Sequence, residues 1–198
     1  MKIIFATHNK HKIEEVRHLV DKRFMLLSLQ HVDLAEDIPE DYQTLEENAL
    51  FKAKFIFQKT GIPTFADDTG LEIAALNNRP GVFSARYAGK NKNDQANMDK
   101  VLKELKNADN RLARFRTVIA FVWNDGKEKL FEGIVNGKIG LVKKGKQGFG
   151  YDPIFIPDGY NITFAEMPLD VKNSISHRSR AFRKFTSFLN KEFLNDKA

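Results

Sequence analysis

The sequence has 198 residues, of which 42% are hydrophobic, and this length and apolar content suit a domain with a core of its own. It contains no cysteine, so disulfides and thiolate metal sites are excluded. The formal net charge is +6, but the lysine and arginine residues are scattered along the chain, which favours a lysine-rich enzyme surface over a nucleic-acid-binding stripe.

The sequence lacks the signals of a membrane or secreted protein. No uninterrupted apolar run approaches the roughly 20 residues that a membrane-spanning helix needs. The apolar stretch from Lys2 to Ala6 is too short for a signal peptide, so we expect a cytoplasmic protein without a membrane partner. No repeat, low-complexity segment or linker divides the chain, and residues 1–198 are predicted to form a single domain.

The first elements are predicted to be a strand and a helix. The apolar run from Lys2 to Ala6 is typical of a buried strand. Apolar residues then recur at helical spacing between Lys10 and Val20, which predicts an amphipathic helix. The segment from Val32 to Glu47 is acidic, contains no lysine or arginine, and is expected to be an exposed loop.

A second helix and strand are predicted next. Thr44 and Glu47 form the capping-box pattern, in which a threonine is followed three residues later by a glutamate. The helix that they open is predicted to end near Lys59, because Gly61 follows. The apolar run from Ile62 to Ala66 then predicts another strand.

The third helix leads into a predicted hairpin. The helix is expected from Asn93 to Lys106, with Asp94 as its cap. The segment from Arg114 to Trp123 is apolar on both alternations, as in a central strand. A turn at residues 124–126 then leads to a partner strand through Val135.

The chain is predicted to end in a helix from about Ser176 to Leu194. Helices and strands therefore alternate early, and a hairpin comes later. This order predicts an α/β fold in which helices cover the faces of a mixed sheet.

The junction between the first strand and the first helix, Thr7 to Lys12, is a candidate phosphate site. A helix start presents unpaired backbone N–H groups, and Thr7, Asn9 and Lys12 add donors and a positive charge. The glycines of a Walker loop are missing. Taken alone, a capped helix start with a surface lysine is the favoured explanation.

Two adjacent carboxylates, Asp67 and Asp68, follow the apolar run that ends at Ala66. Ligands of open α/β sheets bind at strand ends, and Mg²⁺ prefers carboxylate and phosphate oxygens. A carboxylate at such a site can also orient or deprotonate water. A polar turn that caps the next element explains the pair equally well.

Three later segments combine a candidate ligand group with an ordinary structural explanation. Residues 79–89 form a turn in which Arg86 is expected to be structural. Residues 145–153 form a glycine-flanked loop, where Phe149 either stacks on a base or packs inward. Residues 172–178 open the last helix, where basic side chains either bind an anion or are solvated.

Together these segments resemble the family of inosine triphosphate pyrophosphatases, the house-cleaning purine nucleoside-triphosphate pyrophosphatases. The resemblance covers nearly the whole chain. The matching segments occur in family order: Thr7-x-Asn9-x-x-Lys12, Thr44 to Ala53, Ala66-Asp67-Asp68-Thr69-Gly70-Leu71, Pro80-Gly81-x-x-Ser84-Ala85-Arg86-Tyr87, Gly148-Phe149-Gly150-Tyr151-Asp152-Pro153 and Ser176-His177-Arg178.

The resemblance implies an elongated mixed β-sheet flanked by helices, with two lobes and a substrate cleft between them. It also implies a homodimer. Two positions depart from the family pattern, because Thr69 stands where serine is usual and His8 where a small residue is usual. The hydroxyl group is kept at Thr69, whereas His8 either crowds the phosphate turn or adds a cation to it.

The reaction that the resemblance implies is magnesium-dependent: water attacks the α-phosphorus of dITP, ITP or XTP, and pyrophosphate leaves. Glu40 and Asp68 are expected to hold Mg²⁺, with Asp67 in support, and Asp68 is also the expected catalytic residue. The implied substrate-binding residues are Thr7, Asn9, Lys12, Asn48, Lys52, Thr69, Phe149, Gly150, Tyr151, Asp152, Lys172, His177 and Arg178.

Selectivity for deaminated purines is expected to depend on the keto oxygen at position 6 of the base. Candidate donors to it are His177, Arg178 and backbone amides, while Phe149 stacks on the ring. Adenine would leave such buried donors unpaired, at a cost of roughly 1–3 kcal/mol each.

Two rival functions remain open at this point. A related pyrophosphatase could act on pyrimidine or modified nucleotides. The net charge would also fit a nucleic-acid-binding module, but the sequence contains no recognisable motif for one, so we expect no stable nucleic-acid complex.

Overall fold

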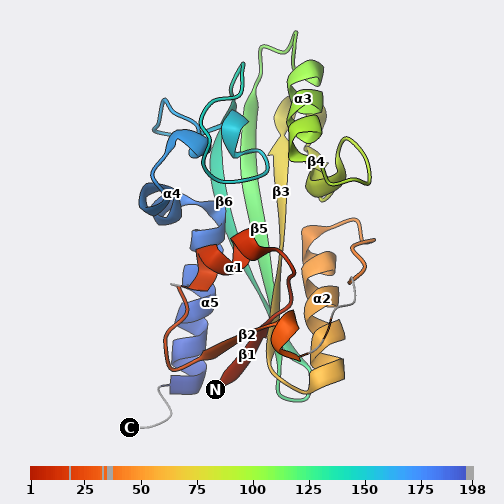
Figure 1. Cartoon of the computed structure of the whole chain (residues 1–198), viewed down its shortest axis with the longest axis vertical. Coiled ribbons are helices and arrows are strands. Elements are labelled where there is room, and N and C mark those ends of the chain that lie inside the picture. The colour runs from red at the N-terminus through yellow and green to blue at the C-terminus, as the bar shows by residue number, and fades with distance from the viewer. Residues whose placement is uncertain (18, 33, 35–37, 195–198) are drawn as a thin grey trace. The chain divides into compact units, whose positions relative to one another are not determined.

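The structure is a computed structural model that describes residues 1–17, 19–32, 34 and 38–194 (Figure 1). Within these residues, five α-helices accompany one seven-stranded sheet. The helices are α1 (Lys10–Arg17), α2 (Leu45–Thr60), α3 (Asp94–Glu104), α4 (Leu169–Ile175) and α5 (His177–Leu194). The strands are β1 (Lys2–Phe5), β2 (Met25–Ser28), β3 (Thr64–Ile73), β4 (Arg79–Gly81), β5 (Leu112–Trp123), β6 (Lys127–Ile139) and β7 (Phe155–Pro157).

The sheet is mixed, as predicted. Its hydrogen-bonded order is β2-β1-β3-β5-β6-β7, and β4 pairs with β3. Strand β1 is parallel to both β2 and β3, whereas β4 is antiparallel to β3 and β7 is antiparallel to β6. The α/β class predicted from the order of elements is therefore confirmed.

The chain divides into two compact units, and each is assembled from separate stretches. The first unit contains Met1–Asp68, Thr117–Gly133 and Arg178–Ala198. The second contains Thr69–Arg116 and Ile134–His177. The single domain expected for residues 1–198 stays a prediction.

The core of the first unit is a cluster of phenylalanine rings. Phe5 of β1 stacks on Phe65 of β3, with ring centroids 4.5 Å apart and planes inclined by 16°. Phe182 of α5 meets both rings edge-on, and Phe185 lies 4.9 Å from the Phe65 ring. These contacts pack α5 against the neighbouring strands β1 and β3.

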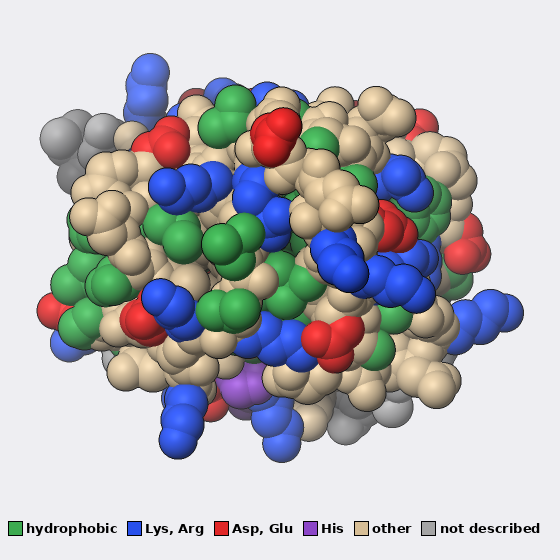
Figure 2. Space-filling view, turned by 90° about the horizontal axis from the view of Figure 1, so that it is seen from above, with side chains coloured by type: hydrophobic (Ala, Val, Ile, Leu, Met, Phe, Trp, Pro, Cys, Tyr) green, Lys and Arg blue, Asp and Glu red, His purple; other side chains and the backbone are tan. Residues whose placement is uncertain are grey.

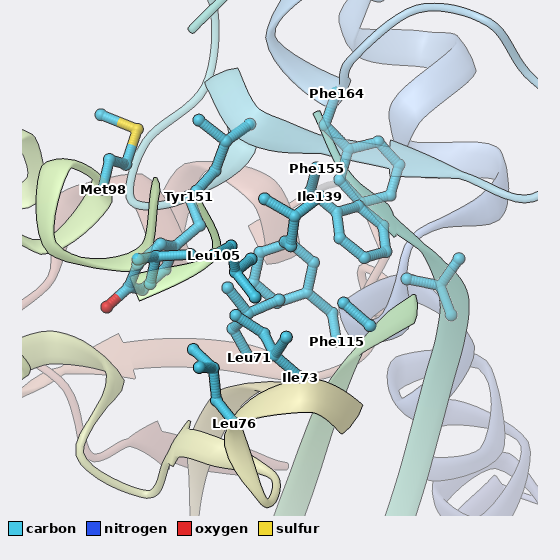
Figure 3. Close-up of a cluster of buried hydrophobic side chains, with 14 of the residues drawn as sticks. Leu71, Ile73, Leu76, Met98, Leu105, Phe115, Ile139, Tyr151, Phe155 and Phe164 are labelled. Atoms are coloured by element: carbon cyan, nitrogen blue, oxygen red, sulfur yellow. The ribbon is translucent and has the colours of Figure 1, made fainter. Parts of the chain in front are cut away.

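The core of the second unit packs α3 against the parts of β3, β5 and β6 that belong to this unit. Figure 3 shows Leu71, Phe115 and Phe155 meeting in this cluster, with Met98 of α3 at its edge. The Phe115 and Phe155 rings have centroids 4.7 Å apart. Tyr151 also belongs to this core, so part of the glycine-flanked loop is anchored by burial.

The predicted start of α2 is confirmed in detail. The side chain of Thr44 accepts a hydrogen bond from the Glu47 backbone N–H, and Gly61 ends the helix in the left-handed conformation with φ of 65°. Glycine adopts this conformation without steric cost. The helix is therefore held at both ends, which fixes the backbone of the side chains that it carries.

The structure corrects one predicted helix cap and adds one short helix. Asn93, rather than Asp94, caps α3, because its side chain accepts from the Ala96 backbone N–H while Asp94 accepts from Gly150. The predicted last helix is confirmed as α5, but a short helix that was not predicted, α4, precedes it, and Ser176 with extended backbone angles separates the two. Lys172 therefore lies in α4 and not at the start of the last helix.

Candidate functional site

The two aspartates lie inside β3, whereas the predicted strand ended before them at Ala66. Strand β1 pairs with β3 only as far as Phe5 opposite Phe65, but β3 continues to Ile73. It can continue because β5 is its hydrogen-bonded neighbour on the other side and β4 pairs with its far end. Asp67 and Asp68 nevertheless lie beyond the carboxyl end of β1, which is where ligands of α/β sheets bind.

Asp67 is the centre of a buried ionic cluster. Its Oδ1 atom lies 2.8 Å from Lys12 Nζ, and its Oδ2 atom lies 3.4 Å from Arg178 Nε. The carboxylate is fully buried, which by itself would raise its pKa, but the charges of Lys12, Arg178 and Lys52 outweigh this and hold the pKa well below its usual range. Asp67 is thus charged at neutral pH and anchors two cations.

Lys52, on α2, lies beside three oxygen atoms. Its Nζ atom donates to Glu40 Oε1 at 2.8 Å and to the Asp67 backbone carbonyl at 2.8 Å, and it lies 3.7 Å from Asp68 Oδ1. The side chain of Lys52 is only 7% exposed. Burial raises the pKa of Asp68, against the opposing charges of Lys52 and Lys12.

The Thr7 to Lys12 segment forms the predicted helix start. The Asn9 side chain accepts from the Lys12 backbone N–H, and Thr7 Oγ1 accepts from the Asn9 backbone N–H. The alternative of a surface lysine is wrong, because the Lys12 side chain is only 14% exposed and pairs with Asp67. Burial also lowers the pKa of Lys12. His8 is exposed.

Asn48 has a positioning contact that the sequence did not suggest. Its amide oxygen accepts from the Tyr42 backbone N–H at 3.1 Å, and its amide nitrogen donates to the Tyr42 carbonyl at 3.3 Å. Asn48 therefore ties the segment that carries Glu40 to helix α2. Nothing in the helical spacing of Asn48 and Lys52 indicated this, because the partner is a backbone group outside the helix.

Glu15 is a member of the cluster that sequence reasoning missed. Its carboxylate pairs with Nη1 of Arg178, so the buried guanidinium lies between Glu15 of α1 and Asp67 of β3. Arg178 is 3% exposed. A glutamate on an amphipathic helix carries no sign of a partner far along the chain, so no local signal could have identified it.

The second unit contains another group of predicted site residues. Asp152 Oδ2 accepts from Lys172 Nζ at 2.7 Å and from the Phe149 backbone N–H at 2.9 Å. Lys172 Nζ also lies 5.2 Å from the centroid of the Phe149 ring. Gly148 has φ of 76°, and a Cβ atom there would lie 2.0 Å from Asp152 Oδ2. A buried ion pair therefore shapes the loop that carries Phe149.

The remaining predicted residues lie in β3, in the glycine-flanked loop and at the start of α5. Tyr151 donates from its hydroxyl to the Ser84 carbonyl at 2.8 Å, and burial raises its pKa well above the usual range. His177 is buried and stacks on Phe115 with ring centroids 4.5 Å apart. Gly150 donates its backbone N–H to Asp94, and Thr69 is a half-buried residue of β3.

The donors around Lys52 fit a magnesium ion. Oxygens of Glu40, Asp67 and Asp68 already surround one cation, and hard oxygen donors are those that Mg²⁺ prefers. Across the described part of the chain, no three acidic, histidine or cysteine side chains form a metal-binding group. A magnesium ion beside Lys52 would therefore be held by the carboxylates of Glu40 and Asp68, and phosphate oxygens and water would complete its coordination shell.

Two surface observations bear on the rival functions. On the face shown in Figure 2, lysine and arginine side chains are interspersed with acidic and hydrophobic ones and do not form a single stripe. None of the helices that the structure describes is long and apolar enough to cross a membrane.

Comparisons with known proteins identify relatives of this chain. The chain is 51% identical to the dITP/XTP pyrophosphatase of Christiangramia forsetii over 191 residues, which cover 96% of this chain and 100% of the relative. It is 44% identical to the dITP/XTP pyrophosphatase of Bacillus subtilis, with 94% and 96% of the two chains covered.

The fold is also that of a solved structure. The Ham1 protein of Staphylococcus aureus superposes with a TM-score of 0.90 at 38% identity, over 97% of this chain and 100% of that one. The profile of the Ham1 family matches residues 3–188. The chain therefore belongs to the Ham1 family.

Proposed function

We propose that this protein hydrolyses deaminated purine nucleoside triphosphates, dITP, ITP and XTP, to the monophosphate and pyrophosphate with the help of Mg²⁺, and so keeps these nucleotides out of DNA and RNA. The chain is a nucleoside-triphosphate pyrophosphatase, like the relatives that carry this name. The observation that carries the proposal is the buried cluster in which Lys12, Lys52 and Arg178 meet Asp67 and Asp68.

The triphosphate is proposed to bind at the cluster of the first unit. Thr7, Asn9, Lys12 and Lys52 supply hydroxyl, amide and ammonium donors beside the start of α1. Glu40 and Asp68 would hold Mg²⁺, which supplies charge neutralisation of the phosphate oxygens when bound. Asp67 supports this metal site by fixing Lys12 and Arg178, which its two carboxylate oxygens contact.

Asp68 is the proposed catalytic base. Its carboxylate accepts the proton of the water that attacks the α-phosphorus. Burial raises the pKa of Asp68, so its carboxylate holds a proton more readily than an exposed aspartate does. The attack breaks the bond between the α-phosphorus and its bridging oxygen, and pyrophosphate leaves with that oxygen.

The base is proposed to bind to residues around Phe149. The ring of Phe149 is held by the Asp152 and Lys172 pair and offers a face for stacking. His177, Arg178 and backbone N–H groups are the proposed donors to the keto oxygen at position 6. Asn48, Thr69, Gly150 and Tyr151 complete the proposed substrate-binding residues.

A substrate panel tests this proposal. The protein is incubated with Mg²⁺ and each of ITP, dITP, XTP, ATP, GTP, dUTP and dTTP, and pyrophosphate release is measured with and without EDTA. We expect release from ITP, dITP and XTP that EDTA abolishes. Preference for dUTP or dTTP would overturn the assigned substrates, and salt-dependent nucleic-acid binding without any turnover would overturn the enzymatic function.

A homodimer is also proposed, on the family resemblance. The second unit exposes apolar side chains, among them Leu141 at 78% and Leu112 at 62%. Light scattering coupled to size-exclusion chromatography measures the mass directly. A mass of one chain at micromolar concentration would contradict the proposal.

A further inference from the structure

The surroundings of Lys52 resemble those of a bound metal ion. Its ammonium group contacts two carboxylates and one backbone carbonyl, and its side chain is nearly buried. Lysine rarely becomes this buried unless opposite charges compensate for the lost hydration. The ammonium group therefore supplies the positive charge that keeps Glu40 and Asp68 together.

These contacts conflict with the two tasks in the proposed function. Glu40 and Asp68 are the proposed metal ligands, while Lys52 is a proposed phosphate donor. A divalent ion bound by both carboxylates would lie within a few ångströms of the ammonium group, at a distance where like charges repel strongly. The present contacts of Lys52 and a bound ion thus exclude each other.

The parts of this cluster differ in how easily they can move. Lys52 carries its charge on a flexible four-carbon stem, so the ammonium group can swing away while α2 stays in place. Both ends of α2 are capped, and Asn48 ties the Glu40 segment to the helix. Asp68 is fixed within β3. Movement of the lysine side chain alone is enough to open the oxygens to another cation.

We propose that Lys52 is a resident counter-ion, which holds Glu40 and Asp68 in the metal-free protein and is displaced by the divalent ion. The displaced ammonium group then becomes available to the phosphates. This inference rests on the proposed function, since it takes the same two carboxylates as metal ligands. It adds that Lys52 competes with the metal, so that the nucleotide-free protein binds a divalent ion weakly.

The test measures metal affinity without turnover. Binding of Mn²⁺ to the nucleotide-free protein is followed by calorimetry for the wild type, Lys52→Met and Lys54→Met. We expect Lys52→Met to bind Mn²⁺ about tenfold more tightly, because a competing charge has been removed. Lys54 is the matched control, since it lies on the same helix, its side chain is 43% exposed and it pairs with Glu128, so Lys54→Met should bind as the wild type does.

Equal or weaker Mn²⁺ binding by Lys52→Met would overturn the inference. Should this variant fail to fold, the wild type decides the question through the NMR signal of the Lys52 side chain, which Lys52→Arg identifies by its loss. Saturation with Mg²⁺ must shift this signal, and an unchanged signal would overturn the inference.

A third arm separates this inference from the proposed function. Mn²⁺ binding to the wild type is repeated with a non-hydrolysable inosine triphosphate analogue. Metal binding in this complex together with unchanged affinity of Lys52→Met would overturn only the counter-ion role. Absence of metal binding in every sample would overturn both.

Discussion

At the scale of single residues, the adjacent Asp67 and Asp68 are expected to behave differently although their side chains have the same chemistry. Three cations hold the pKa of Asp67 low against the effect of burial, whereas burial raises the pKa of Asp68. Their position on a strand directs successive side chains to opposite faces, which gives each aspartate its own neighbours. The pair therefore divides into a charged anchor and a candidate base.

Replacement of the candidate base is expected to abolish most of the activity. Asp68→Asn keeps the size of the side chain but removes the proton acceptor, so kcat for dITP should fall by about 100-fold or more. Circular dichroism at matched concentration checks that the variant is folded. Normal turnover in a folded Asp68→Asn protein would rule out the catalytic role.

Asp67 is expected to affect how the unfolding free energy of the metal-free protein changes in acid. Because the pKa of Asp67 is lowered by folding, its contribution is present above the unfolded pKa of about 4 and is lost as the pH falls below that value. Asp67→Asn should therefore lose unfolding free energy less steeply than the wild type between about pH 5 and pH 3.

Urea unfolding in the presence of a chelator measures this slope. Asp68→Asn is the internal comparison, because a pKa raised by folding has the opposite effect and its removal should make the acid loss steeper. Identical slopes for the wild type and Asp67→Asn would show that the ion pairs of Asp67 do not contribute to stability.

At the scale of elements, the buried carboxylate of Asp152 helps to shape the loop between β6 and β7. Asp152 fixes both the backbone at Phe149 and the side chain of Lys172 from α4. Gly148 leaves room for this carboxylate only because it has no side chain. The position of Phe149 thus depends on Gly148 and on this ion pair.

Gly148→Ala is expected to displace the Asp152 carboxylate and to loosen the loop. We expect the KM for dITP to rise several-fold or more, since the Phe149 ring would lose its fixed position. Gly159→Ala is the control, because Gly159 also has positive φ, 83°, but has open space around its Cβ position. Both variants carry the backbone cost of about 1–2 kcal/mol, and equal KM values would contradict the role of the Asp152 contact.

At the scale of the whole molecule, local patterns in the sequence predicted most elements but not their long-range partners. The capping box at Thr44 and the turn at residues 124–126 depend on near neighbours, and both were predicted correctly. The length of β3 was not, because it depends on pairing with strands distant in the sequence. The short helix α4 was also not predicted, because its seven residues are too few to show a helical apolar pattern.

The candidate site was likewise predicted from local motifs, but its long-range contacts were not. The motifs predicted that Lys12, Lys52 and the aspartates act together, and the structure brings them into one cluster. The contact of Arg178 with Glu15 could not be predicted, since the two residues come from opposite ends of the chain. Which of the named residues bind substrate stays a prediction.

The aromatic core of the first unit should carry much of the stability of that unit. Phe185 is fully buried and contacts the rings of Phe65, Phe121 and Phe131, so Phe185→Ala should lower the unfolding free energy by about 3–5 kcal/mol. Phe83→Ala is the comparison, because Phe83 is 40% exposed and its loss should cost about 0.5 kcal/mol or less. Chemical denaturation measures both values, and similar losses of unfolding free energy in the two variants would contradict this account.

The discontinuous first unit has a consequence for protein synthesis. Its final stretch begins at Arg178, and α5 supplies rings that cover Phe5 and Phe65. While a ribosome is still translating the chain, β1 and β3 are already made but the helix that buries their aromatic faces is not. The nascent chain must therefore carry an exposed patch of phenylalanine until its last segment emerges, and this interval is when a chaperone would protect it best.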